Sequence, residues 1–141
     1  FAGITTAIAG PLTTSEYSYN FGTISMKAGN VSHVYMIKNT SEKPLTITKL
    51  STSCMCTKAT LIIGEKTVGP FGMPGHGGSV PAINEVLPAG EEAQIAVTFD
   101  PAAHGSAGIG NVDRKIFVES TWGTGSTFYF TIPLNIKTHR R

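Results

Sequence analysis

Residues 30–39 read NVSHVYMIKN, and their side chains form two sets that alternate with a period of two residues. In an extended chain one face of this stretch carries Val31, His33, Tyr35 and Ile37. Successive side chains of a β-strand point to opposite sides of the sheet, so such alternation is typical of a strand with one buried face. The stretch therefore predicts a half-buried strand of an antiparallel sheet.

The same alternation recurs along the chain, in residues 44–50, 91–101, 114–120 and 127–138. β-Branched and aromatic residues are concentrated in these runs, and turn residues separate them. No segment shows a sustained 3.6-residue apolar repeat. We therefore expect an all-β protein with an immunoglobulin-like antiparallel β-sandwich of about seven strands. The Cys-Trp-Cys spacing of an antibody domain is missing.

The length of 141 residues predicts a single domain. We expect residues 1–19 to form an N-terminal extension and residues 20–141 to form the sandwich. Residues 57–90 interrupt the even spacing of strands, and part of this segment is rich in glycine and proline. We expect it to be one long inserted loop, and a hairpin about Gly64 would fit within it.

The charge pattern argues against nucleic acid as a partner, because the net charge is only +2 and the basic residues are scattered. No apolar run approaches the ~20 residues that a membrane span requires. The letters AIA before Gly10 resemble an export cleavage site. We expect an exported protein, periplasmic or extracellular, and a membrane anchor preceding this stretch is an open alternative.

The only two cysteines lie in the stretch TSCMCTKA, residues 52–59. In an extended strand Cys54 and Cys56 would point to the same side, which brings their sulfur atoms together. Three interpretations stay open: a disulfide closing a small ring, a pair of metal ligands, or two buried thiols that pack as small hydrophobic groups.

As a ligand pair, two thiolates select copper(I), which prefers soft sulfur donors. The glycine-rich segment 69–78 adds Met73 and His76, and it could fold over the cysteines. The sequence therefore predicts a copper(I) site formed by Cys54, Cys56, His76 and Met73. Zinc is the second choice, with His33 or His104 as a further ligand. Met73 could equally be a hydrophobic tether for the loop.

Three stretches together resemble a known family: residues 21–57, 87–101 and 114–121. They contain FGTI, the strand end Asn39-Thr40, PLTI, the Cys-x-Cys-Thr motif and FDP. In this order the motifs resemble a bacterial family of exported Ig-like domains of unknown function, related to the Hydin-type (ASH) domains. Two features depart from the family pattern: Met55 replaces a small residue, and the link after Cys-Thr is expanded. The resemblance implies the fold and export, and it implies no settled activity.

Our hypothesis from the sequence is an exported copper(I)-binding protein for storage, delivery or protection, with a copper donor or acceptor protein as its partner. The alternative is a non-enzymatic Ig-like interaction module in which the cysteines form a structural or redox disulfide. A thiol–disulfide partner is a third possibility. We do not expect an enzyme, because carboxylates are few and dispersed and no phosphate-binding loop is present.

Overall fold

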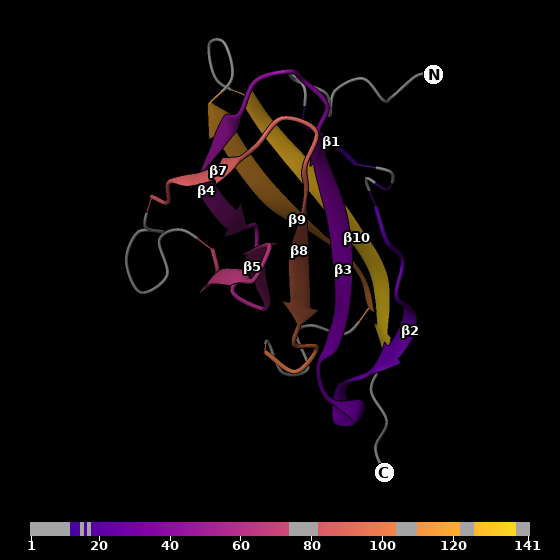
Figure 1. Ribbon diagram of the computed structural model, residues 1–141. Coiled ribbons are helices and arrows are strands. Elements are labelled where there is room, and N and C mark those ends of the chain that lie inside the picture. Colours follow the sequence, from indigo (N-terminus) through magenta and orange to yellow (C-terminus); the bar gives the residue numbers. More distant parts are fainter. Residues whose placement is uncertain are drawn as a thin grey trace.

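The computed structural model describes residues 12–14, 16, 18–73, 82–103, 110–121 and 126–137. They form two five-stranded sheets that face each other (Figure 1). The first sheet contains, in spatial order, β1 (Leu12–Thr14), β3 (Val31–Asn39), β8 (Glu92–Phe99), β5 (Thr57–Ile63) and β6 (Lys66–Phe71). The second sheet contains β2 (Gly22–Ser25), β10 (Ser126–Lys137), β9 (Gly110–Thr121), β4 (Leu45–Thr52) and β7 (Glu85–Leu87).

The predicted immunoglobulin-like β-sandwich is confirmed, with ten strands in the described part of the chain rather than about seven. Neighbouring strands are antiparallel except β2 and β10, which run parallel. The strands at the sheet edges are mostly short, and each of them pairs with a single neighbour. The helical structure in the described residues is a single 3-10 turn at Met26–Ala28.

The core follows from the alternation of the central strands. Tyr35 of β3 pairs with Ile95 of β8, and Ile95 pairs with Leu61 of β5; all three side chains are fully buried. The intervening residues of β3 point outward, so that Val34 is 44% exposed and Met36 is 37% exposed. Burying one face of each sheet against the other supplies the main driving force for folding.

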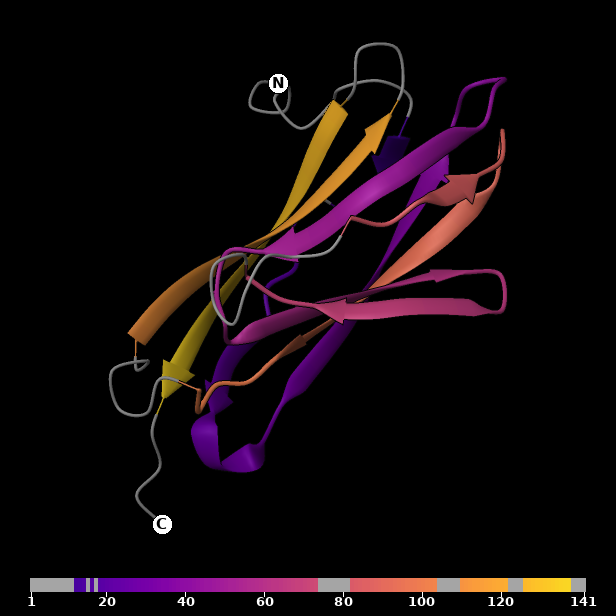
Figure 2. The ribbon, with the colours of Figure 1, turned by 90° about the vertical axis from the view of Figure 1, so that its left-hand side faces the viewer.

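The predicted inserted loop begins as regular structure. β5 and β6 form an antiparallel hairpin whose turn contains Gly64, and this hairpin extends the first sheet (Figure 2). Gly64 has φ of +60°, a conformation that glycine adopts without steric cost. The hairpin expected about Gly64 is therefore present. Residues 74–81, in the middle of the predicted loop, lie outside the described residues.

Asn39, at the end of β3, joins three parts of the chain although its side chain is completely buried. Its amide nitrogen donates toward the carbonyl oxygens of Lys43, Leu87 and Pro88 at 2.9, 3.0 and 3.3 Å. Its amide oxygen accepts hydrogen bonds from the backbone N–H and the hydroxyl of Ser41. The side chain thus serves backbone groups of the connection after β3 and of the end of β7 (Glu85–Leu87) with the connection that follows it.

Candidate functional site

The two cysteines lie in the connection between β4 and β5, where the chain crosses from one sheet to the other. The hydroxyl of Thr52 is 2.9 Å from the carbonyl oxygens of both Cys54 and Thr57, and its proton is shared between them. The backbone N–H of Thr57 also donates to the carbonyl of Cys54 at 3.1 Å. These bonds hold residues 53–56 in a compact turn that is tied to both sheets.

Cys54 and Cys56 form a disulfide within this turn. Their Cα atoms are 5.1 Å apart, shorter than the roughly 6.7 Å expected for residues i and i+2 of an extended strand. The sequence argument placed the pair in a strand, whereas the chain turns here and brings the sulfurs within bonding distance. The two residues are 6% and 3% exposed, while Met55 between them is 41% exposed.

The sulfur of Cys56 lies among hydrogen-bond donors. The Nε–H of Arg114 donates to it at 3.1 Å, and the hydroxyl of Thr57 is 3.3 Å away. A disulfide sulfur carries no proton, so the hydroxyl is the donor in that contact. The sulfur of Cys54 accepts a hydrogen bond from the backbone N–H of Cys56 at 3.1 Å. The positive charge of the Arg114 guanidinium therefore lies next to the sulfur of Cys56.

The guanidinium of Arg114 is held in place by the backbone carbonyl of the preceding residue. Its Nη1 donates to the carbonyl of Asp113 at 2.9 Å. Burial lowers the pKa of Arg114 from its ordinary value, and the carboxylate of Asp113 acts in the opposite direction. A guanidinium keeps its proton at neutral pH, so the group remains a cation beside the disulfide.

No spacing in the sequence connects Arg114 with Cys56, which lies 58 positions earlier. The pairing of β4 with β9 brings them together, with Thr52 opposite Ile116. Beyond that pair, the backbone N–H of Ser53 donates to the carbonyl of Lys115, and the N–H of Lys115 donates to the hydroxyl of Ser53. Sequence analysis missed Arg114 because only this register places its side chain at the turn.

Of the other residues predicted to bind copper(I), the structure describes Met73. Met73 is half-buried and follows Gly72, whose carbonyl accepts a hydrogen bond from the N–H of Thr52 at 3.1 Å. This bond brings the Met73 segment beside the end of β4. His76 and His104 lie outside the described residues. Within the described ranges, no group of three His, Cys, Asp or Glu side chains is arranged to hold a metal ion.

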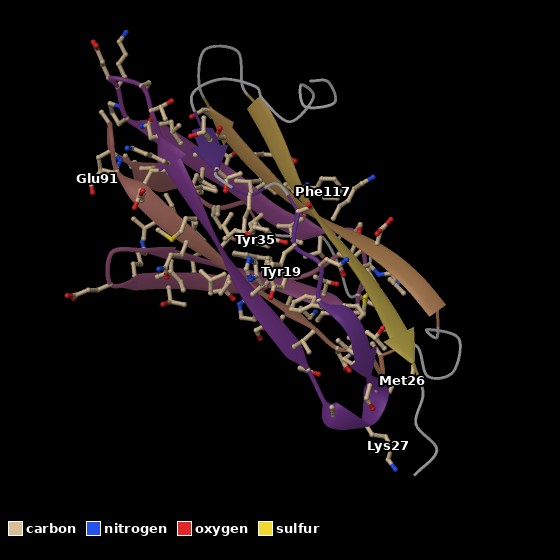
Figure 3. All side chains as sticks on the ribbon, turned by 90° about the vertical axis from the view of Figure 1, so that its right-hand side faces the viewer. Tyr19, Met26, Lys27, Tyr35, Glu91 and Phe117 are labelled. Carbon is tan, nitrogen blue, oxygen red and sulfur yellow. A yellow bond between two sulfur atoms is a disulfide. The ribbon has the colours of Figure 1, made fainter. Side chains whose placement is uncertain are left out.

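His33, the alternative zinc ligand, belongs to a different cluster. Its Nε2 is 2.6 Å from a carboxylate oxygen of Glu16, and its ring stacks on Tyr19 with centroids 3.6 Å apart. The ring of Tyr35 meets His33 edge to face at 4.8 Å. Figure 3 shows Tyr19 and Tyr35 close together in the middle of the sandwich. This cluster anchors the segment before β2 to β3.

Tyr35 should make the protein less stable at alkaline pH. Burial, followed by the nearby Glu16 and Tyr19, raises the pKa of Tyr35 above its ordinary value. Above about pH 10 the unfolded chain loses this proton while the folded chain keeps it, so the free energy of unfolding falls with rising pH. The fall from this group is at most about 1.4 kcal/mol per pH unit.

The Tyr35→Phe variant tests this expectation, because it removes the titrating group and keeps the ring. Urea unfolding of both proteins between about pH 9 and pH 11 should show a steeper loss of stability for the wild type. Parallel curves for the two proteins would mean that the hydroxyl of Tyr35 titrates equally in both states.

Comparison with known families identifies one match, over residues 12–70, to a family described as "Protein of unknown function (DUF1573)". This match, over part of the chain, confirms the predicted resemblance to a family of unknown function. No curated protein matches the chain at a significant level.

Solved structures share the fold at low sequence identity. A protein of unknown function from Porphyromonas gingivalis W83 has a TM-score of 0.63 at 12% identity, over 96% of this chain and 50% of that one. The ASH/PapD-like domain 7 of human CEP192 has a TM-score of 0.57 at 13% identity, over 92% and 87%. The secreted serine protease VesC from Vibrio cholerae has a TM-score of 0.53 at 12% identity, over 89% and 23%.

These similarities extend to the fold alone, and the chain spans only part of the P. gingivalis protein and of VesC. Across the described ranges, no helix is long and apolar enough to cross a membrane.

Proposed function

We propose that this Ig-like β-sandwich is an exported protein-interaction module whose Cys54–Cys56 disulfide exchanges with the thiols of a partner protein. It acts stoichiometrically, as a thiol–disulfide partner rather than as an enzyme. The observation that carries the proposal is the hydrogen bond from the Nε–H of Arg114 to the sulfur of Cys56 at 3.1 Å. A purely structural disulfide has no need of a cation at one sulfur.

The chemistry needs one partner, a protein with two thiols. One thiolate of the partner attacks a sulfur of the disulfide, the Cys54–Cys56 bond breaks, and the second sulfur leaves as a thiolate. The other thiolate of the partner then attacks the mixed disulfide. Two electrons pass from the partner, which ends with a disulfide, to this chain, which ends with two thiols. A leaving thiol of low pKa leaves faster, and a neighbouring cation lowers the pKa of a thiol.

We propose the location of the protein on the same chemical grounds. Disulfides persist in oxidising compartments such as the periplasm or the extracellular space. The weak net charge of +2 offers no electrostatic attraction for nucleic acid. An exported protein that meets other exported proteins with thiols therefore fits the site best.

Copper(I) binding is the second candidate, favoured by the hydrogen bond between Thr52 and Gly72 that brings the Met73 segment next to the cysteine turn. Copper(I) would bind only after the Cys54–Cys56 disulfide is reduced, because both thiols must be free to act as ligands. Arg114 works against it, since a cation beside Cys56 repels a metal cation. Thiol–disulfide exchange uses Arg114 directly, and for this reason we propose it ahead of copper(I) binding.

The replacement Arg114→Met tests the proposed function, because it removes the charge and keeps an unbranched apolar chain. We expect reduction of the disulfide by dithiothreitol to become about tenfold slower, since one hydrogen bond to a charged group is worth about 1.5 kcal/mol. The rate is measured by quenching with acid and counting free thiols at several pH values.

Lys115→Met is the matched control, because Lys115 is the next residue of β9 and its side chain is exposed. This variant should be reduced at the wild-type rate. Thermal unfolding of both variants checks that the sandwich is intact. Equal reduction rates for the wild type and Arg114→Met would refute the proposed role of the cation. Tight copper(I) binding by the reduced protein, without exchange against protein dithiols, would favour the second candidate.

A further inference from the structure

The turn that carries the disulfide is flanked by two cations, and from them we infer that the exchange partner is an acidic protein whose two reactive thiols lie among carboxylates. This inference rests on the proposed function and specifies the chemistry of its partner. It does not depend on which sulfur is attacked. The two sulfurs are bonded to each other, so the same charges lie near both.

The first cation belongs to the turn segment itself. Residues 52–59 contain one charged side chain, that of Lys58. Lys58 is exposed, and its Nζ lies 2.8 Å from the position that a β-carbon on Gly72 would occupy. The carbonyl of Gly72 accepts a hydrogen bond from the N–H of Thr52, so this ammonium group lies beside the base of the turn. Among the described residues, no carboxylate forms an ion pair with it.

The second cation comes from β9. The Nε–H of Arg114 donates to the sulfur of Cys56 at 3.1 Å, and the ion pairs in the described part of the chain do not include this guanidinium. Its neighbours Asp113 and Lys115 point to the opposite face of the strand, because successive side chains alternate. They carry opposite charges on that shared face, so they largely offset each other.

One further carboxylate, that of Asp100, lies close to the turn. The N–H of Asp100 donates to the carbonyl of Cys56 at 2.8 Å. Its Oδ1 accepts a hydrogen bond from the N–H of Ala102 at 2.9 Å, within the turn that follows β8. This carboxylate is therefore engaged by its own backbone, whereas Lys58 and Arg114 lack an acidic partner within the described ranges. The charge that contacts the disulfide is positive.

These cations act on a partner before the sulfurs meet. Opposite charges attract over a Debye length, about 8 Å at physiological ionic strength, and they speed the encounter of complementary surfaces. Carboxylates around a thiol raise its pKa, so the free partner holds less of the reactive thiolate. Contact with Lys58 and Arg114 lowers that pKa again, and the attacking thiolate forms where the disulfide is. A partner with cations around its thiols would be repelled.

The exchange itself keeps its balance of atoms and electrons. The partner's two thiols lose two electrons and two protons and form a disulfide. Cys54 and Cys56 gain both and become thiols.

Three small dithiols that differ only in charge test the inference on the intact oxidised protein. Dihydrolipoamide is neutral, dihydrolipoate carries a carboxylate at the same end of its chain, and the 2-aminoethyl amide of dihydrolipoic acid carries an ammonium group. Each becomes a cyclic disulfide as it reduces the protein. The reaction is quenched with acid, and free protein thiols are counted after the small dithiol has been removed.

At an ionic strength of about 10 mM, we expect dihydrolipoate to react about threefold faster than dihydrolipoamide, and the ammonium probe about threefold slower. This factor corresponds to unit charges roughly 7 Å apart in water. At about 1 M salt the three rates should converge, because the Debye length is then only about 3 Å.

The variant Lys58→Met removes one cation and keeps an unbranched side chain. Its ratio of the dihydrolipoate rate to the dihydrolipoamide rate should fall toward one. Lys43→Met is the matched control, because it removes the same charge from an exposed residue just before β4. The cysteines follow the other end of this 8-residue strand, roughly 26 Å away, so the control should keep the wild-type ratio.

Equal rates for the three dithiols at low ionic strength would overturn the inference and leave thiol exchange itself intact. An equal fall of the ratio in Lys58→Met and Lys43→Met would also overturn it, because net charge rather than the turn would then set the rate. A disulfide that none of the dithiols reduces would overturn the proposed function, and this inference with it.

Discussion

Replacing Asn39 by aspartate should destabilise the protein by about 3–5 kcal/mol, the range measured when a buried charge is left without its partner. The amide nitrogen of Asn39 faces three carbonyl oxygens, of Lys43, Leu87 and Pro88. A carboxylate oxygen in its place would face these oxygens with no proton to donate. The site is fully buried, so water cannot relieve the repulsion.

Asn20→Asp is the matched control for this substitution. The side-chain oxygen of the exposed Asn20 accepts a hydrogen bond from the N–H of Gly22 at 2.7 Å, and a carboxylate accepts the same bond. We expect a change within about 0.5 kcal/mol. Urea unfolding at neutral pH compares the two variants with the wild type. Near pH 4 the Asn39→Asp variant should recover part of its stability, because protonation restores one donor. Equal stabilities of the two variants at neutral pH would contradict the role assigned to Asn39.

Truncating Ile95 to alanine should cost about 2–5 kcal/mol, the usual range for a buried isoleucine. Ile95 is fully buried in β8, between Tyr35 of β3 and Leu61 of β5, which are buried as well. The loss combines the transfer of apolar surface with the cavity that the two neighbouring strands cannot close. Denaturant unfolding measures the change through the shift of the midpoint.

The control for Ile95→Ala is Met36→Ala on the opposite face of the same sheet. Met36 is 37% exposed, and its partner Gln94 precedes Ile95 in β8. We expect this truncation to change stability by less than about 0.5 kcal/mol. A large loss at Met36 together with a small loss at Ile95 would mean that the faces of the sheet are reversed.

The central strands were predictable because their side chains alternate strictly. Residues 31–39 form β3 as a half-buried strand, and of its two predicted faces the one with Tyr35 and Ile37, both fully buried, lies inward. Strand β6 was anticipated only as the second arm of a possible hairpin about Gly64, and its bounds were not predicted. Its sequence, Lys66–Phe71, contains Gly69 and Pro70 and buries only Phe71, so it carries neither the alternation nor the composition of a central strand. Such edge strands are recognised only from the neighbour that completes their hydrogen bonds, here β5.

The candidate site likewise has one feature that neighbouring residues predict and others that depend on residues far apart in the sequence. Because one residue separates Cys54 from Cys56, the sequence by itself placed their sulfurs near each other, and it left open a disulfide, a pair of metal ligands or two buried thiols. Only the tertiary structure decided the turn between the sheets, the disulfide, and the position of Arg114 against Cys56. The reason is physical: alternation and close spacing are properties of a local chain segment, whereas a contact across 58 positions depends on the register in which β4 and β9 pair.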